Sequence, residues 1–145
     1  MNTITQDKQT ADRAKIRALT ELWRKTWSPQ DKPFTGKGFE DIFATRENEI
    51  LVFDNFDNGV VVLHSLTEYL ETWIPVMKNF SYWEIQLEDN LTIAVNGDLA
   101  VTTFSWAGGG KTKDGQEVKA RQYGTHTWKR LNDEWRLIHE HLTVG

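Results

Sequence analysis

The feature that most constrains this chain is a pair of alternating runs near its C-terminus, between Arg121 and Thr143. The runs flank the polar segment from Leu131 to Glu134, which has the composition of a tight turn. A two-residue turn at Asn132-Asp133 would place Leu131 opposite Glu134 and would fix the pairing of the two strands. The sequence therefore predicts a closing β-hairpin with a defined register.

This register also assigns each side chain to one face of the hairpin, because side chains alternate along a strand. Trp128 would lie across from Leu137, and His126 would lie across from His139. One face would carry His126, Trp128, Trp135, Leu137, His139 and His141, and the other would carry Tyr123, Thr125, Arg136, Ile138, Glu140 and Leu142. Three of the four histidines would then share one strip, which makes this strip a candidate site. A register shifted by one residue would instead turn Glu140 and Arg121 inward.

The length and composition indicate one domain rich in aromatic residues. A chain of 145 residues suits a single core. We expect residues 1–9 to form a flexible polar arm and residues 10–145 to form the domain. Seven Trp and seven Phe are many for this length, and aromatic side chains both fill cores and line apolar pockets.

The charge and the residue types exclude several classes of function. A formal net charge of -4 without a basic run argues against binding to nucleic acid, which needs clustered Lys and Arg. The absence of cysteine excludes disulfides and thiolate chemistry. The N-terminus lacks the apolar core of a signal peptide, and no apolar run approaches the roughly 20 residues that span a membrane. We therefore expect a cytoplasmic protein with no membrane partner.

Two helices are predicted before the closing strands. The first runs from a cap at Thr10 to about Trp27, where Ser28-Pro29 ends it. Its expected apolar stripe is Ala11, Ala14, Ala18, Leu19, Leu22, Trp23, Thr26 and Trp27. The second helix opens at Ser65, because Glu68 three residues later completes a capping box, and it runs to about Asn79 with a kink at Pro75.

The remaining segments read as short strands, after a short helix at 38–43. The expected strands are 49–54, 60–63, 82–87, 91–95 and 99–106, with a hairpin turn at Asn96-Gly97. The glycine-rich segment 108–115 is expected to be a flexible loop. Helices followed by a meandering sheet predict an α+β fold. A strongly curved antiparallel sheet around the first helix would form a cone with an apolar hollow.

The run from Trp128 to Thr143, W-x-x-x-x-x-E-W-R-L-I-H-E-H-L-T, resembles the closing hairpin of SnoaL-like proteins. These belong to the nuclear transport factor 2-like (cystatin-like) superfamily, together with ketosteroid isomerase. The likeness extends through Asn96-Gly97-Asp98, the Ser65 helix, the Phe53-Asp54 strand and the first helix. It is closest to the association (hub) domain of calcium/calmodulin-dependent kinase II and its bacterial relatives. The resemblance implies a cone-shaped α+β barrel with a pocket between sheet and helices. It also implies a homodimer through the sheet face, or a larger ring as in hub domains.

The sequence departs from the hub domain inside the pocket. The two sheet arginines of the hub pocket fall on Trp106 and His126, so the resemblance does not imply recognition of carboxylates by paired guanidinium groups. Because one fold hosts many activities, the resemblance implies a hollow and leaves the reaction open.

Three residues are candidates for catalysis. Asp54 closes an apolar strand, and a carboxyl among apolar walls has a raised pKa that suits a general base. The alternative is a turn residue that binds the backbone of 55–58. Imidazole titrates near neutral pH, so His126 and His139 could move protons in a pocket, or they could form a structural pair.

Four residues are candidates to contact a ligand, and each has a plainer alternative. Trp106, Tyr82 and Trp128 would line the hollow or pack in the core, and His141 would lie near the end of the strand or at an interface. The hairpin histidines could converge on zinc. No carboxylate shares their predicted face, however, and the family is generally metal-free, so we predict neither a metal nor a cofactor.

Three functional hypotheses remain. The first is a pocket that binds a small apolar or aromatic molecule. The second is a cofactor-free isomerase, dehydratase or cyclase that uses Asp54 or His126 for proton transfer. The third is a hub-like homo-oligomerisation module.

Overall fold

The computed structural model describes residues 3–145, which form an α+β fold, as predicted. The elements are α1 (Thr3–Thr26), a short 3-10 helix η1 (Phe39–Asp41), β1 (Leu51–Phe56), β2 (Gly59–Leu63), α2 (Leu66–Met77), β3 (Phe80–Leu87), β4 (Thr92–Asn96), β5 (Leu99–Thr112), β6 (Glu117–Leu131) and β7 (Glu134–Val144). The strands form one seven-stranded sheet in the order β2-β1-β7-β6-β5-β3, and β4 pairs with the first part of β5.

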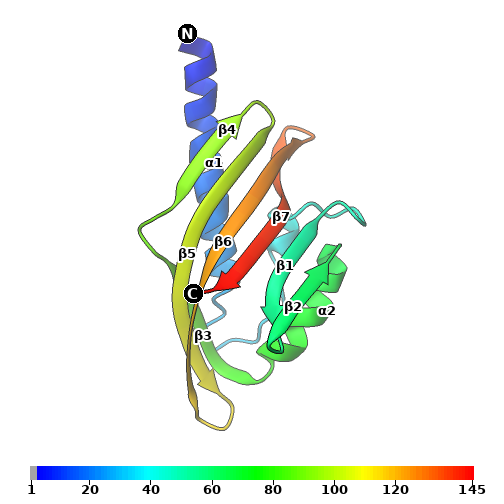
Figure 1. Ribbon diagram of the computed structural model, residues 1–145, viewed down its shortest axis with the longest axis vertical. Helices are drawn as coiled ribbons and strands as arrows, with labels where there is room; N and C mark the ends of the chain where they lie inside the picture. Colours follow the sequence, from blue (N-terminus) through cyan, green and yellow to red (C-terminus); the bar gives the residue numbers. More distant parts are fainter. Residues whose placement is uncertain (1–2) are drawn as a thin grey trace.

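The sheet curves around α1, so that the core lies between them (Figure 1). In Figure 1, α1 lies behind β5 and β6, and α2 lies beside β2. Inward-facing side chains of both layers are almost fully buried, among them Trp23, Phe104, Trp128 and Leu137. The curved sheet with α1 along one of its faces agrees with the predicted cone (Figure 1).

Helix α1 begins earlier than predicted and buries a different stripe. It starts at Thr3, so most of the predicted arm is helical, while residues 1 and 2 lie outside the described residues. Thr10 is not the cap: its hydroxyl donates to the Gln6 carbonyl within the helix. The predicted positions Ala11, Ala14 and Ala18 are exposed. The buried stripe is Asp12, Ile16, Leu19, Thr20, Trp23 and Trp27.

A polar residue could join this stripe because the sheet supplies its partners. The Asp12 carboxylate accepts hydrogen bonds from Arg130 at 2.8 Å and from the Trp135 indole at 3.1 Å. A buried carboxylate with two such donors is compensated for its lost hydration. The actual stripe contains an aspartate, so hydrophobic periodicity alone would not find it.

Helix α2 begins as the capping box predicts. The Ser65 hydroxyl accepts from the Glu68 N–H at 3.1 Å, and the Glu68 carboxylate accepts from the His64 N–H at 3.2 Å. Pro75 lies inside the last turn, and the helix ends at Met77. No helix within residues 3–145 is both long enough and apolar enough to cross a membrane.

The predicted loop at 108–115 is wrong, because its glycines form part of β5. Gly108, Gly109 and Gly110 pair with β3 on one side and with β6 on the other. A Cβ atom at Gly110 would collide with the carbonyl oxygen of Tyr82. The glycines are therefore needed for a close approach of two backbones in a sharply bent sheet. The preceding turn also differs, since Asn96 pairs with Leu99 and the turn is Gly97-Asp98.

The closing hairpin keeps the predicted register only near its turn. Leu131 pairs with Glu134 and Trp128 with Leu137, as predicted. The prediction that His126 lies across from His139 is wrong, because His126 pairs with Glu140. The register shifts between Thr127 and Trp128, which leaves Ile138 as an extra residue in β7. Such a β-bulge exchanges the two faces of the strand beyond it.

The bulge lies where β7 changes its neighbour on the other edge. Before it, the Leu137 N–H donates to Ile42 at 2.7 Å and the Leu137 carbonyl accepts from Ala44 at 3.0 Å. After it, β7 pairs in parallel with β1, beginning with His139 opposite Leu51. The additional residue allows β7 to pair first with the segment 42–44 and then with β1. It also turns the Glu140 side chain inward.

Candidate functional site

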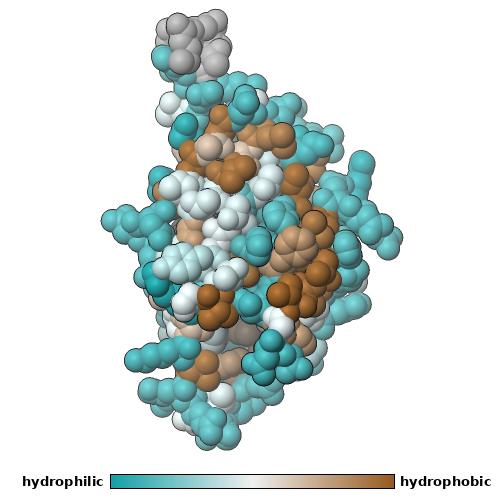
Figure 2. Space-filling model, in the orientation of Figure 1, coloured by the Kyte–Doolittle hydropathy of each residue, from teal (hydrophilic) through white to brown (hydrophobic). Residues whose placement is uncertain are grey.

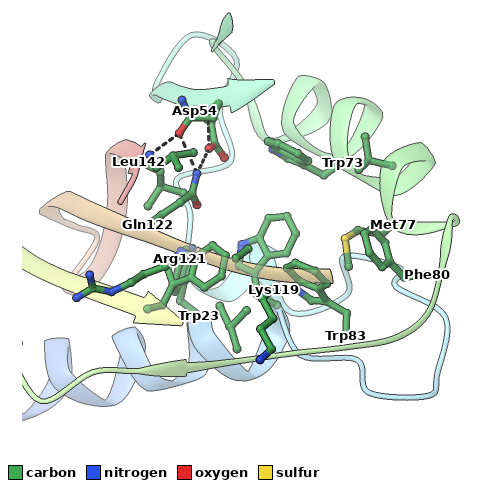
Figure 3. A pocket seen from close by; sticks show the side chains of 17 residues that line it. Trp23, Asp54, Trp73, Met77, Phe80, Trp83, Lys119, Arg121, Gln122 and Leu142 are labelled. Atoms are coloured by element: carbon green, nitrogen blue, oxygen red, sulfur yellow. Dashed lines mark hydrogen bonds between the residues drawn. The ribbon is translucent and has the colours of Figure 1, made fainter. Parts of the chain in front are cut away.

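A cavity of about 400 Å³ lies between the sheet and the helices (Figure 3). Five tryptophans line it: Trp23, Trp27, Trp73, Trp83 and Trp106. The apolar lining is completed by Val76, Met77, Phe80, Ile85, Ala120, Leu142 and Val144. The cavity therefore has mainly aromatic and aliphatic walls, as binding sites for small molecules usually do.

Helices α1 and α2 and strands β3 and β5 position the tryptophans. Trp23 lies on α1, and Trp27 directly follows the last residue of α1; its N–H donates to the Trp23 carbonyl at 3.0 Å, so both side chains face the same side. Trp73 comes from α2 and meets Trp27 edge-to-face, with ring centroids 5.9 Å apart. Trp83 of β3 and Trp106 of β5 form a second edge-to-face pair at 6.4 Å. The walls are thus rings held by packing against one another.

One end of the cavity is polar and contains Asp54, which is only 4% exposed. Its Oδ1 accepts from the Gln122 side chain at 2.9 Å and from the Asn55 N–H at 2.7 Å (Figure 3). Gln122 also donates to the Asn55 side chain at 3.2 Å. Within residues 3–145, no hydrogen bond reaches the Asp54 Oδ2 atom. One carboxyl oxygen is therefore held in place while the other has no protein partner.

Burial, followed by the negative charge of Glu140, raises the pKa of Asp54 to about 7. The hydrogen bonds from Gln122 and Asn55 act in the opposite direction. Because the pKa is near neutrality, both the carboxylic acid and the carboxylate are populated at physiological pH. Such a group can accept and return a proton.

Behind the aromatic wall lies a second carboxyl group, Glu140, which is fully buried. It accepts hydrogen bonds from the Trp23 indole at 2.9 Å and the Tyr69 hydroxyl at 2.8 Å, and its Oε2 lies 3.0 Å from His126 Nε2. The Tyr69 oxygen in turn accepts from the Trp27 indole at 3.0 Å. Burial and the charge of Glu140 raise the pKa of Tyr69 well above its usual value, so Tyr69 stays protonated and donates.

His126 belongs to this buried group and is not among the residues that line the cavity. Its ring is fully buried and packs against Phe104, Trp23 and Trp128 at centroid distances of 4.6, 5.0 and 5.7 Å. Its Nδ1 atom is buried without a hydrogen-bond partner among the described residues. His126 thus reaches the cavity only through Glu140 and Trp23.

The other two hairpin histidines lie on the opposite face from His126. The rings of His139 and His141 flank Phe53 at 5.5 and 5.4 Å, and His139 Nδ1 lies 2.7 Å from the Leu51 carbonyl oxygen. The predicted histidine strip is therefore wrong, because the bulge at Ile138 separates His126 from the other two. Within residues 3–145, no three His, Asp or Glu side chains are grouped so that they could hold a metal ion.

Of the four residues predicted to contact a ligand, one lines the cavity, and the other three lie in the core or on the surface. Trp106 lines the cavity. Trp128 is buried in the core, where its indole donates to Thr102 at 3.1 Å. Tyr82 is 39% exposed, and its hydroxyl donates to Glu84 at 2.6 Å. His141 borders a shallow groove on the outer face of the sheet.

Several residues of this site were not predicted, for identifiable reasons. Trp23, Trp27 and Trp73 were assigned only to buried helix faces, although tryptophans one turn apart on a helix are also a signal for an aromatic wall. Gln122 carried no recognisable motif. Glu140 was assigned to the outer face, because a β-bulge leaves no reliable mark in the sequence. Arg121 reaches the rim of the cavity, but its guanidinium points away and binds Glu88 at 2.7 Å (Figure 3).

The model of the SnoaL-like domain family matches residues 34–145, and the chain belongs to this family. The fold is similar to a nuclear transport factor 2-like superfamily protein from Salmonella enterica serovar Typhimurium, with 20% identity and a TM-score of 0.78 over 94% of this chain and 92% of that chain. A proposed dehydratase of the NTF2-like family from Streptomyces avermitilis has 16% identity and a TM-score of 0.75, over 94% of this chain and 97% of that chain.

The predicted likeness to the hub domain is confirmed at the level of the fold. The association domain of CaMKII from C. elegans has 12% identity and a TM-score of 0.66, over 94% of this chain and 98% of that chain. No curated protein matches the sequence. At such low identities the solved structures define the fold, and the function has to be argued from the cavity.

The raised pKa of Asp54 predicts how stability changes with pH. The folded protein binds its proton up to about pH 7, whereas the unfolded chain releases it near the ordinary value of 3.8. The free energy of unfolding should therefore fall as the pH rises between these values, by at most about 4 kcal/mol. Asp54→Asn has no carboxyl group to titrate at this position, so its free energy of unfolding lacks this fall. Relative to the wild type, the variant should therefore become more stable as the pH rises from 3.8 to about 7. Denaturant unfolding of the wild type and of Asp54→Asn at several pH values measures the two free energies of unfolding. If the difference between them does not vary with pH, the raised pKa of Asp54 is contradicted.

Proposed function

We propose that this protein binds a small, largely apolar molecule that contains at least one ring, in the cavity described above. The observation that carries the proposal is the cavity of about 400 Å³ with five indole walls and one polar end. Ligand pockets have volumes of about 300–1,000 Å³, with apolar walls and a few placed polar groups. The indole faces would contact the ring of the ligand, and the Asp54 end would orient its polar group.

The hydrogen-bonding groups around the cavity support a ligand with at least one polar atom. Asp54 Oδ2 has no protein partner within residues 3–145. When protonated, it would donate to a carbonyl oxygen of the ligand, and when ionised, it would accept from a hydroxyl of the ligand. The expected class is therefore a cyclic ketone, lactone or phenol.

Filling the cavity should abolish binding. Ala120 lines the cavity, and a phenylalanine there would occupy ligand space. For Ala120→Phe we expect affinity for aromatic ketones and phenols to fall by at least about tenfold. The control is Ala94→Phe, which adds the same ring at an exposed position on β4. Tryptophan fluorescence titration and native mass spectrometry report binding, and equal affinities in both variants would sink the proposal.

The second candidate function is proton transfer by Asp54, as in an isomerase, dehydratase or cyclase. It is favoured by the pKa of about 7 and by the carboxyl oxygen without a protein partner at the polar end of an apolar cavity. Asp54 as carboxylate would take a proton from carbon next to a ligand carbonyl and would return it elsewhere on the molecule. A dehydratase is also what has been proposed for the Streptomyces avermitilis protein of similar fold.

The pH dependence of turnover tests this second function. Because the base must be ionised, kcat/KM on an enolisable cyclic ketone should rise with pH and level off above about 7. Asp54→Asn should lower kcat by about 10²–10⁴ while the ligand still binds. Asp57→Asn makes the same change in the exposed β1–β2 turn and serves as the control. A fully active Asp54→Asn would exclude Asp54 as the base.

The outer face of the sheet supports self-association as well. Figure 2 shows apolar side chains gathered over β1 and β2 and over the β4–β5 hairpin. Val60 and Val62 on β2 and Leu99 and Val101 on β5 are each at least 42% exposed. We expect a homodimer through this face, with larger rings as the alternative suggested by the similarity to the CaMKII association domain. Light scattering should give twice the monomer mass for the wild type and a monomer for Val101→Lys. A wild-type monomer at high concentration would contradict this.

A further inference from the structure

The buried carboxylate of Glu140 is connected to both the walls and the polar end of the cavity. Its hydrogen bond from Trp23 holds one cavity wall directly. Its hydrogen bond from Tyr69 holds a second wall indirectly, because the Tyr69 oxygen accepts from the indole of Trp27. The orientations of two adjacent indole rings therefore depend on one side chain that does not itself line the cavity.

The geometry around Glu140 is that of an ionised carboxylate. Both of its oxygens accept hydrogen bonds, one from Tyr69 and the other from Trp23, and His126 completes the group. A fully buried carboxylate is stable only when donors replace its hydration. Indole N–H groups and a tyrosine hydroxyl stabilise the negative charge of Glu140. They carry no permanent positive charge of their own, so they do not cancel the effect of the Glu140 charge on groups farther away.

This charge acts on the polar end of the cavity. Asp54 and Glu140 come from the paired strands β1 and β7, where Val52 lies opposite Glu140. The groups that face Asp54 are Gln122 and Asn55 through hydrogen bonds, and Glu140 and Tyr69 through the interior. After burial, the charge of Glu140 is the next cause of the raised pKa of Asp54.

We propose that Glu140 is the positioning residue of this site: it fixes the Trp23 and Trp27 walls and places its negative charge on the strand next to that of Asp54. The inference rests on the proposed function, since it describes how the same cavity binds and exchanges protons with its ligand. Glu140 does not contact the ligand. It acts through two indole rings and through its charge.

The variant Glu140→Gln separates these roles from simple packing. Glutamine has nearly the same shape, but it carries no charge and its amide N–H₂ cannot accept from Trp23 or Tyr69. In the variant we expect Asp54 to lose its proton about one pH unit lower, which is a tenfold lower proton affinity. We also expect the affinity for an aromatic ketone to fall by about tenfold, because one wall loses its fixed orientation.

The titration is measured on the full chain without any ligand. Carbon-13 NMR of labelled aspartate carboxyls follows Asp54, whose signal is assigned by its loss in Asp54→Asn. A lower midpoint in Glu140→Gln supports the inference, and an unchanged midpoint overturns it. A wild-type protein that binds no probe would sink the proposed function, whereas the titration would still decide the role of Glu140.

A matched variant distinguishes charge from general loosening of the interior. Tyr69→Phe breaks the relay to Trp27 and leaves the Glu140 charge in place. It should weaken ligand binding without lowering the Asp54 midpoint, and an equal drop of the midpoint in both variants would overturn the inference. Should Glu140→Gln fail to fold, Trp23→Phe removes the direct indole donor but keeps an aromatic ring. Unchanged affinity in both Trp23→Phe and Tyr69→Phe would then overturn it.

Discussion

The extra residue at Ile138 determines which side chains of the last strand reach the interior. Side chains alternate with a period of two, so one inserted residue exchanges the faces of everything beyond it. Leu137 and Glu140 both point inward, while His139 and His141 lie outside. The insertion is stabilised from both edges of β7, since the segment Ile42–Ala44 pairs before it and β1 pairs after it. The carboxylate of Glu140, which organises the cavity wall, therefore points inward because of the backbone bulge at Ile138.

Two carboxyl groups in one apolar interior are stabilised in different ways. Glu140 accepts a hydrogen bond on each of its two carboxyl oxygens. Asp54 has two donors on one oxygen only, and burial together with the charge of Glu140 raises its pKa to about 7. In the proposed function, Asp54 is the group that exchanges a proton with a molecule in the cavity.

The sequence predicted the parts of the structure that depend on local chemistry. The α+β class, the cap at Ser65 and the turn at Asn132-Asp133 follow from residue types at fixed spacings, and the structure agrees with them. The family resemblance, carried by the same hairpin, is likewise confirmed. Asp54 was a candidate because a carboxyl group that ends an apolar strand is placed among apolar neighbours, and it lies at the polar end of the cavity. Its role as a base stays a prediction.

The parts that the sequence could not predict depend on partners far away in the chain. The bulge requires two neighbours of β7 that are separated from it by more than 80 residues. The glycines of β5 read as a loop because their need for a small residue arises only from the approach of β3. The stripe on α1 includes Asp12, whose burial depends on Arg130 and Trp135. In each case tertiary contacts override a local pattern.

The strand register between β6 and β7 in solution is the measurement that tests the buried network most directly. Backbone nuclear Overhauser effects between facing residues report which pairs lie across from each other. We predict cross-strand contacts between His126 and Glu140 and between Thr127 and His139. Contacts between His126 and His139 would instead mean an uninterrupted hairpin. Glu140 would then point away from the core, and the buried network behind the cavity would not exist.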